Sequence, residues 1–259
     1  MYSKAQLKDQ LREMGIDPKG TLLVHSSMKA IGQVEDGPEG VIDVLMDYMK
    51  DGLLVFPTHT WKQIREKTYP LFDVVNEPSC VGLLTNIFRV RPGVIRSLHP
   101  THSVAAYGKD AAEYVSGEEN HITPCGKGSC WYKLYERKAQ ILFIGCGTHR
   151  NTFLHGVEEW NNVPNRLTER LQLLYTRAAD GKIYPIPQYR HYSRPPVTEV
   201  SQRYNKMEET FVKKGAMHYG RFGDAHCALG DAVMMCDITS ACLKIDIHLF
   251  DDHREVPEI

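Results

Sequence analysis

The sequence predicts an α/β domain, in which a mixed or mainly parallel central sheet is flanked by helices and followed by a loop-rich C-terminal third. Short, continuously apolar runs that are typical of buried strands alternate with segments of helical periodicity, and this alternation favours a sheet covered on both faces. The periodicity weakens after about Trp160. No long polar linker divides the 259 residues, so we expect one domain over residues 1–259.

The first half of the chain alternates between helix and strand. The spacing of Leu7, Leu11 and Met14 predicts a first helix, and Asp36 is expected to cap a second helix that reaches Met49. The other expected elements are strands at 21–24, 53–56, 103–107 and 140–145 and a helix around 81–88.

The second half gives weaker signals. Pro185 and Pro187 are expected to prevent any regular element over residues 184–189. Residues 201–214 regain helical character, whereas residues 232–235 and 243–247 are expected to form short strands.

Composition excludes several classes of function. The chain has 31 basic and 32 acidic side chains and a formal net charge of -1, so no general field favours nucleic acid or an anionic membrane. Seven cysteines without a C-x-x-C pair argue against a disulfide scaffold and a structural zinc site. No signal peptide or membrane span is recognisable, so we expect a cytoplasmic monomer or homodimer.

Polar clusters follow predicted strands or glycine-rich turns, where an α/β domain places its ligands. Any one cluster, taken alone, is better explained by helix capping or by hydrogen bonds to the backbone than by catalysis, and that alternative stays open. The clusters are His25-Ser26-Ser27, Thr58-His59-Thr60, Arg96-Ser97-Leu98-His99-Pro100, and Gly145-Cys146-Gly147-Thr148 leading to Leu154-His155-Gly156-Val157-Glu158.

The order of these clusters resembles the motif order of the aminoglycoside 3-N-acetyltransferase family. The matching motifs are V-H-S-S with Gly32, Pro57-Thr58, R-S-x-H-P at 96–100 with Ser103, Ala106 and Gly108, His121 before Gly126-Lys127-Gly128-Ser129, I-L-x-I-G at 141–145, and T-x-L-H-x-x-E at 152–158. The resemblance covers almost the whole chain. It implies transfer of an acetyl group from acetyl-CoA to a small-molecule amine, of the aminoglycoside 3-amino type or a related amino sugar or amine metabolite, without a metal.

Amine acetylation requires a base for the proton that the amine sheds, and a neutral imidazole suits this role near neutral pH. By resemblance, His121 is the expected base, with His99 as a second candidate. Glu158 is expected to orient the imidazole, since it follows His155 by three residues and shares its helical face. Glu159 is expected to be a surface residue.

The first motif is expected to bind the cofactor through backbone amides and hydroxyl groups, with Lys29 near a phosphate. The expected cofactor-binding residues are His25, Ser26, Ser27, Met28, Lys29, Ile31, Gly32, Arg96 and Ser97, the last two by resemblance. The expected substrate-binding residues are Thr58, His155, Arg190 and Arg194.

The segment from Tyr184 to Arg194 departs from the family, because members that acetylate aminoglycosides look rich in Asp and Glu there, and this chain has no carboxylate. Arg190 and Arg194 would repel a polycation, whereas they would bind a phosphate or carboxylate. The hypothesis is therefore a neutral or anionic amine acceptor. The alternative is that both arginines face solvent or bind the phosphates of CoA.

Two other classes of protein remain open. A metal-dependent hydrolase is conceivable because His99-x-x-His102 has ligand spacing and several further histidines are present, although no acidic partner completes a recognisable metal motif. A non-catalytic relative that only binds CoA is the second alternative. Metal analysis and an assay of thioester turnover with an amine panel separate these classes.

Overall fold

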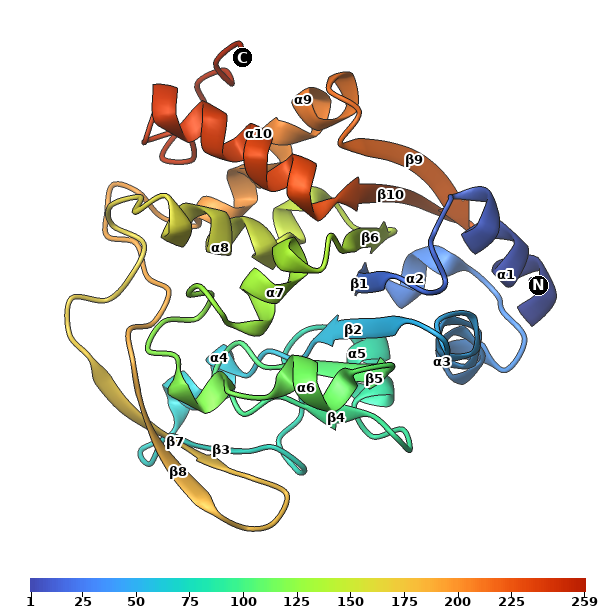
Figure 1. Cartoon of the computed structure of the whole chain (residues 1–259), viewed down its shortest axis with the longest axis horizontal. Helices are drawn as coiled ribbons and strands as arrows, with labels where there is room; N and C mark the ends of the chain where they lie inside the picture. Colours follow the sequence, from blue (N-terminus) through green and yellow to red (C-terminus); the bar gives the residue numbers. More distant parts are fainter.

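The structure is a computed structural model that describes residues 1–259, and its centre is a seven-stranded mixed sheet (Figure 1). Strand order is β4-β5-β2-β1-β6-β10-β9, in which β1 pairs in parallel with β2 and β6 and all other pairs are antiparallel. The strands are β1 (Thr21–Ser26), β2 (Leu53–Pro57), β4 (Ile95–Arg96), β5 (Val104–Gly108), β6 (Gln140–Ile144), β9 (Met217–Phe222) and β10 (Ala225–Asp231). The predicted mixed α/β class is confirmed.

Both faces of this sheet are covered by helices, because successive apolar residues of each central strand point to opposite faces. Leu22 and Val24 join a cluster of 24 buried residues, whereas Leu23 joins a cluster of 32 on the other face. The first cluster involves α1 (Lys4–Glu13), α2 (Met28–Ile31), α3 (Gly37–Tyr48) and α5 (Leu83–Phe88). The second involves α6 (Ala111–Val115), α7 (Cys130–Glu136), α8 (Thr152–Trp160), α9 (Glu208–Lys213) and α10 (Ala232–Ile245).

A second sheet of three strands contradicts the expected irregular segment. It has the order β3-β7-β8, with β3 (Leu71–Asp73), β7 (Gln172–Arg177) and β8 (Ile183–Gln188). Pro185 and Pro187 lie in β8, an edge strand, and both are exposed while Ile186 and Gln188 are buried. Because an edge strand leaves half of its N–H groups without a strand partner, prolines at alternate positions do not break the ladder.

The C-terminal strands expected at 232–235 and 243–247 are also wrong, because residues 232–235 and 243–245 belong to the single helix α10, and residues 246–247 follow its end without forming a strand. The Asp231 side chain accepts a hydrogen bond from the backbone N–H of Met234 and so caps this helix. Its buried residues recur at helical spacing: Ala232, Met235, Cys236, Thr239, Cys242 and Leu243.

The other predicted helices are present, with one difference at a cap. Asp36 occupies the position before α3, but it has a left-handed backbone (φ 57°) and its side chain forms an ion pair with Lys4 instead of a cap. The remaining elements are α4 (Trp61–Glu66) and the 3-10 helices η1 (Glu118–Asn120), η2 (Thr148–Arg150) and η3 (Val200–Met207). None of the helices combines the length and apolar character required to cross a bilayer.

Candidate active site

Imidazole rings from distant segments gather beyond the carboxyl ends of the parallel strands. His59 follows β2, His102 lies between β4 and β5, His155 is in α8 and His191 follows β8. Ring centroids are 4.8 Å apart for His59 and His102, 4.7 Å for His102 and His191, and 4.5 Å for His155 and His191. Both sheets and helix α8 therefore bring four histidines into one continuous cluster.

His155 is held by a phenol and a buried carboxylate. The Tyr204 hydroxyl lies 2.6 Å from His155 Nδ1 and donates to Glu158 Oε2 at 2.5 Å. Because the single phenolic proton goes to Glu158, Nδ1 of His155 carries the proton that Tyr204 accepts, and Nε2 keeps its lone pair. Burial, together with the charges of nearby His191, His59 and Arg166, lowers the pKa of His155 well below 6.5. The ring is therefore neutral near pH 7, with its basic nitrogen unengaged.

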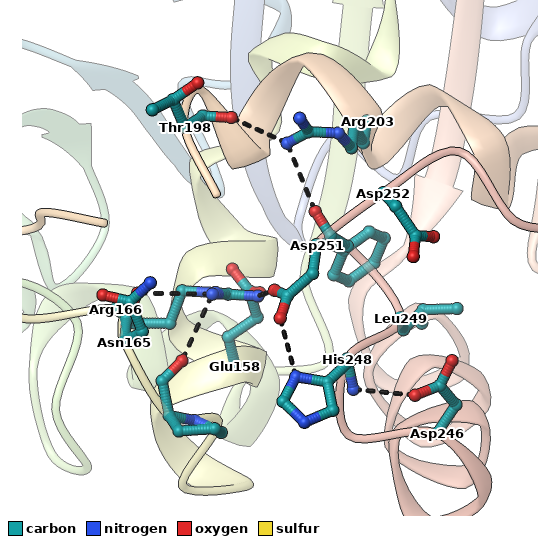
Figure 2. Close-up of polar contacts among 12 residues, drawn as sticks. Glu158, Asn165, Arg166, Thr198, Arg203, Asp246, His248, Leu249, Asp251 and Asp252 are labelled. Carbon is teal, nitrogen blue, oxygen red and sulfur yellow. Dashed lines mark hydrogen bonds and ion pairs between the residues drawn. The ribbon is translucent and has the colours of Figure 1, made fainter. Parts of the chain in front are cut away.

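Glu158 is fixed from its other side by an ion-pair network (Figure 2). Arg166 Nε lies 2.5 Å from Glu158 Oε1, and Arg166 Nη2 lies 2.5 Å from Asp251 Oδ1. Burial disfavours the charged guanidinium, but the two carboxylates outweigh it and raise the pKa of Arg166. His248 Nδ1 in turn lies 2.6 Å from Asp251 Oδ2. The network therefore connects the C-terminal segment to the carboxylate behind His155.

Glu159 is not the expected surface residue. Its side chain is only 6% exposed, and its Oε1 lies 2.7 Å from His191 Nε2 and accepts the backbone N–H of Cys125 at 3.0 Å. His191 Nδ1 lies 3.2 Å from His102 Nε2. Glu159 thus anchors the second half of the histidine cluster.

The other buried histidines have structural contacts. His99 Nδ1 accepts the backbone N–H groups of Thr101 and His102, and its Nε2 is buried without a partner. Burial lowers the pKa of His99 to about 3. His59 Nε2 lies 3.0 Å from Thr152 Oγ1. His99, the second candidate base, therefore presents no solvent-accessible nitrogen.

His121 lies at the start of the loop before α7, where its ring would lie 3.3 Å from a Cβ added at Gly128. Burial lowers its pKa, although the ring is only half-buried. The expected pairing of His121 with Glu158 is not found, because both carboxylate oxygens of Glu158 are engaged by Arg166 and Tyr204. Glu158 faces His155 instead, at 3.8 Å from Nδ1.

The first motif divides into exposed and buried parts. Ser26, Ser27 and Met28 are half-buried, and Lys29 is exposed. His25 is buried and stacks on Phe143 with a centroid distance of 5.2 Å, and burial lowers its pKa to about 3. Residues 26 to 29 and the half-buried Gly32 therefore have surface available to a cofactor, whereas His25 has almost none.

Ile31 and Gly32 act in the packing of this turn. Ile31 is fully buried in the core. Gly32 has φ 80°, and a Cβ there would lie 2.0 Å from Asp224 Oδ2. Glycine is required at position 32 because other residues rarely adopt this backbone conformation, and because Asp224 occupies the space that a side chain would need.

Arg96, Ser97 and Thr58 form a buried internal network rather than a ligand surface. Arg96 donates to Thr58 O at 2.7 Å and to Glu77 O at 2.6 Å, and its guanidinium lies over the Phe72 ring. Ser97 Oγ accepts the backbone N–H of Val104. These contacts leave no group of Arg96 or Ser97 for a cofactor and none of Thr58 for a substrate, which differs from the roles expected from sequence.

The two arginines of the segment from Tyr184 to Arg194, Arg190 and Arg194, have different surroundings. Arg194 is exposed and forms an ion pair with Glu169 at 2.7 Å. The guanidinium of Arg190 donates only to the neutral amide oxygen of Gln172, at 3.2 Å, and its pKa is lowered by burial and by nearby Arg65. Only Arg190 keeps an uncompensated charge.

Sequence reasoning does not identify Arg166, Tyr204 and Asp251, and it assigns no role to His191. Tyr204 and Asp251 are separated by 46 and 85 residues from their partners Glu158 and Arg166. Contacts between residues so far apart in the sequence leave no local pattern from which they could be predicted. A polar residue on the apolar face of a predicted helix, such as Tyr204, is the one available signal.

A model of the family described as aminoglycoside 3-N-acetyltransferase matches residues 23–244. Aminoglycoside N(3)-acetyltransferase IV of Salmonella sp is 32% identical over 185 residues, which is 70% of this chain and 67% of that protein. The SPbeta prophage-derived aminoglycoside N(3')-acetyltransferase-like protein YokD of Bacillus subtilis (strain 168) is 25% identical and covers 88% of this chain and 87% of its own length.

Solved structures agree with these matches. A histidine-to-alanine mutant of aminoglycoside acetyltransferase AAC(3)-IVa, in complex with a gentamicin, superposes with a TM-score of 0.81 at 26% identity and covers 96% of this chain and 91% of that one. AAC-IIIb in a binary complex with CoASH has a TM-score of 0.81 at 20% identity, with 99% of each chain covered, and shows the same fold.

Proposed function

Because the chain belongs to the aminoglycoside 3-N-acetyltransferase family, we propose that it transfers an acetyl group from acetyl-CoA to a primary amine with His155 as the general base. The single observation that carries the choice of base is the hydrogen-bonded chain from His155 Nδ1 through Tyr204 to Glu158. A base oriented by a second group that is itself fixed is the arrangement that proton transfer requires.

The step conserves atoms and protons. The neutral amine nitrogen attacks the thioester carbonyl carbon, a C–N bond forms, and the amine proton passes to Nε2 of His155. The C–S bond then breaks, the proton passes to the departing thiolate, and the products are the amide and CoA with a free thiol. The carboxylate of Glu158, at 3.8 Å from Nδ1, stabilises the imidazolium that exists between these transfers.

The cofactor site is proposed at the end of β1. The half-buried Ser26 and Ser27 precede α2, and Lys29 is exposed beside them, so hydroxyl groups and one cation are available to the pyrophosphate of acetyl-CoA. His25 and Met28 support this turn from inside. The CoASH complex of AAC-IIIb supports use of the same cofactor.

The acceptor is proposed to be an aminoglycoside-type amine or a related amino sugar. Relatives in complex with a gentamicin and with apramycin support an aminoglycoside. The hypothesis of a neutral or anionic amine depends on Arg190, because Glu169 already neutralises Arg194. A panel of kanamycin, glucosamine and glucosamine 6-phosphate distinguishes these acceptors, since Arg190 favours only the phosphate.

The experiment that tests the base compares His155→Ala with His121→Ala. Loss of a general base lowers kcat by about 10²- to 10⁴-fold. We expect this loss for His155→Ala and less than about a tenfold loss for His121→Ala, measured as thiol release from acetyl-CoA with the best amine of the panel. Calorimetry with acetyl-CoA is expected to give unchanged binding for both variants. The reverse order of kcat values would return the base role to His121.

Further proposals concern the domain organisation, the cellular location and the oligomeric state. We expect a single functional domain over residues 1–259, acting in the cytoplasm as a monomer or homodimer and without nucleic-acid or membrane partners. Sedimentation of the purified protein tests the oligomeric state.

A further inference from the structure

Glu159 differs from the neighbouring Glu158 in having no arginine or lysine partner. Its hydrogen-bond donors are the ring of His191 and the backbone N–H of Cys125. The sulfur of Cys125, a carboxylate oxygen of Glu159 and a ring nitrogen of His191 all lie within 4.8 Å of one another. Cys125 is fully buried, and the side chain of His191 is 13% exposed. A thiol, an imidazole and an uncompensated carboxylate therefore converge at one point.

We propose that Cys125, Glu159 and His191 form a binding site for a divalent cation of the zinc class. Thiolate, imidazole and carboxylate are the ligands that zinc prefers. With zinc-ligand bonds of about 2.0 to 2.3 Å, donors in a tetrahedral site are about 3.3 to 3.8 Å apart. His191 Nε2 and Glu159 Oε1 are 2.7 Å apart in their hydrogen bond, so they need only a small separation to admit the ion, and the three ligand atoms already lie within 4.8 Å of one another. A thiolate and a carboxylate together balance the charge of Zn²⁺.

The surroundings of these three residues already contain the contacts that orient metal ligands. His191 Nδ1 lies 3.2 Å from His102 Nε2, and His102 Nδ1 lies 2.9 Å from Thr101 Oγ1. When Nε2 of His191 binds a metal, Nδ1 carries the proton and His102 Nε2 accepts it, which fixes the ring. The backbone N–H of Cys125 holds Glu159 in the same way.

One of the three ligands, Glu159, is reached from solvent. A cavity of about 640 Å³ beside α8 is lined by Glu159, Thr123 and Lys127, among others, so ions reach the carboxylate from solvent. Three protein ligands leave a fourth position for water, for an amine or for a thiol. Binding releases about one proton, that of Cys125, because the ligand is a thiolate.

Occupancy inhibits acetyl transfer, a consequence that rests on the proposed function. The His191 ring lies 4.5 Å from the His155 ring. A cation on His191 adds positive charge beside the base and thereby disfavours the imidazolium that the transfer requires. Zinc is thus expected to act as an inhibitor of this enzyme and not as its cofactor.

The test uses untagged, reduced protein freed of metal with a chelator. Equilibrium dialysis with Zn²⁺ is expected to give one equivalent bound, and Co²⁺ in its place is expected to produce a thiolate-to-cobalt charge-transfer band. Cys125→Ser and Glu159→Gln are expected to weaken binding at least about tenfold, a loss of about 1.4 kcal/mol. Cys146→Ser, which changes a half-buried thiol elsewhere, is the matched control and is expected to bind as the parent does.

Absence of binding by the parent protein, or a charge-transfer band that persists in Cys125→Ser, would overturn the site. Cys125→Ala provides a second variant if the serine destabilises the fold, which circular dichroism reports. Binding is measured without substrate, so it stands or fails independently of the acetyltransferase proposal. Inhibition of turnover by Zn²⁺ in the parent, lost in Cys125→Ser and reversed by chelator, is the expected functional result.

Discussion

Glu158 and Glu159 are consecutive residues of α8 with little-exposed side chains, yet only Glu158 has a permanently charged partner. Glu158 receives a guanidinium and a phenol, from Arg166 and Tyr204. Glu159 receives an imidazole and a backbone N–H, from His191 and Cys125. Because consecutive residues are about 100° apart around a helix axis, one helix presents the two carboxylates to two different sets of partners.

The pair of Glu158 with Arg166 is a permanent ion pair, whereas the pair of Glu159 with His191 is an ion pair only when the imidazole is protonated. Arg166 stays charged at every accessible pH, so Glu158 always has a counter-charge. His191 is charged only when protonated, so Glu159 gains a counter-charge only from a proton or from another cation. The Glu158 side is therefore suited to orienting a base, and the Glu159 side is suited to binding a cation.

The largest expected effect is on stability. Glu158→Gln leaves Arg166 buried with Asp251 as its only anionic partner, and breaking a buried ion pair in this way costs about 3 to 5 kcal/mol. Glu159→Gln removes no such partner and is expected to cost about 1 kcal/mol. Urea unfolding of both variants measures the free energies. Equal losses would mean that the two carboxylates do not differ in the way their contacts indicate.

A smaller effect is expected from the hydroxyl between His155 and Glu158. Tyr204→Phe leaves the N–H of His155 Nδ1 without an acceptor, and we expect kcat to fall about tenfold, equivalent to about 1.4 kcal/mol. Thr101→Val is the matched control, because it removes the hydroxyl that contacts His102 on the Glu159 side. It is expected to change kcat less than about twofold. A comparable fall in both variants would indicate general loosening of the histidine cluster.

The sequence predicts much of the central sheet, and it predicts that Glu158 lies on the same helical face as His155. Strands β1, β2 and β6 are predictable because they are buried on both faces and therefore continuously apolar. The shared face of His155 and Glu158 follows from helical spacing, and the 3.8 Å separation confirms it.

The wrong strand predictions and the missed partners of the two glutamates have physical reasons. Short apolar runs such as 232–235 have the same pattern in a buried helix and in a strand, so the pattern predicts strands where α10 forms. The partners of Glu158 and Glu159 come from remote segments, and only tertiary packing decides which neighbouring glutamate meets a charge. A glutamate next to another on a helix gives no sign of being buried.

The smallest expected effect concerns Asp251, which contacts Arg166 but not the histidine cluster. Burial holds the pKa of His155 well below 6.5, and the charge of Arg166 lowers it further. Asp251→Asn removes a negative charge that partly offsets Arg166, so the pKa of His155 is expected to fall again. The acid limb of the profile of kcat/KM against pH then moves to lower pH, by about a few tenths of a unit.

The sign of this shift distinguishes electrostatic positioning from structural damage, because misplacement of His155 lowers kcat/KM at every pH without moving the limb. His248→Gln is the matched control on the far side of Asp251, where the imidazole is half exposed and its influence on His155 is weak. An acid limb that stays in place in Asp251→Asn, with kcat/KM unchanged on its plateau, would mean that the charges of Arg166 and Asp251 do not act on His155. In that case the Glu158 side would orient the base by hydrogen bonding alone, and the contrast with Glu159 would be one of geometry rather than of charge.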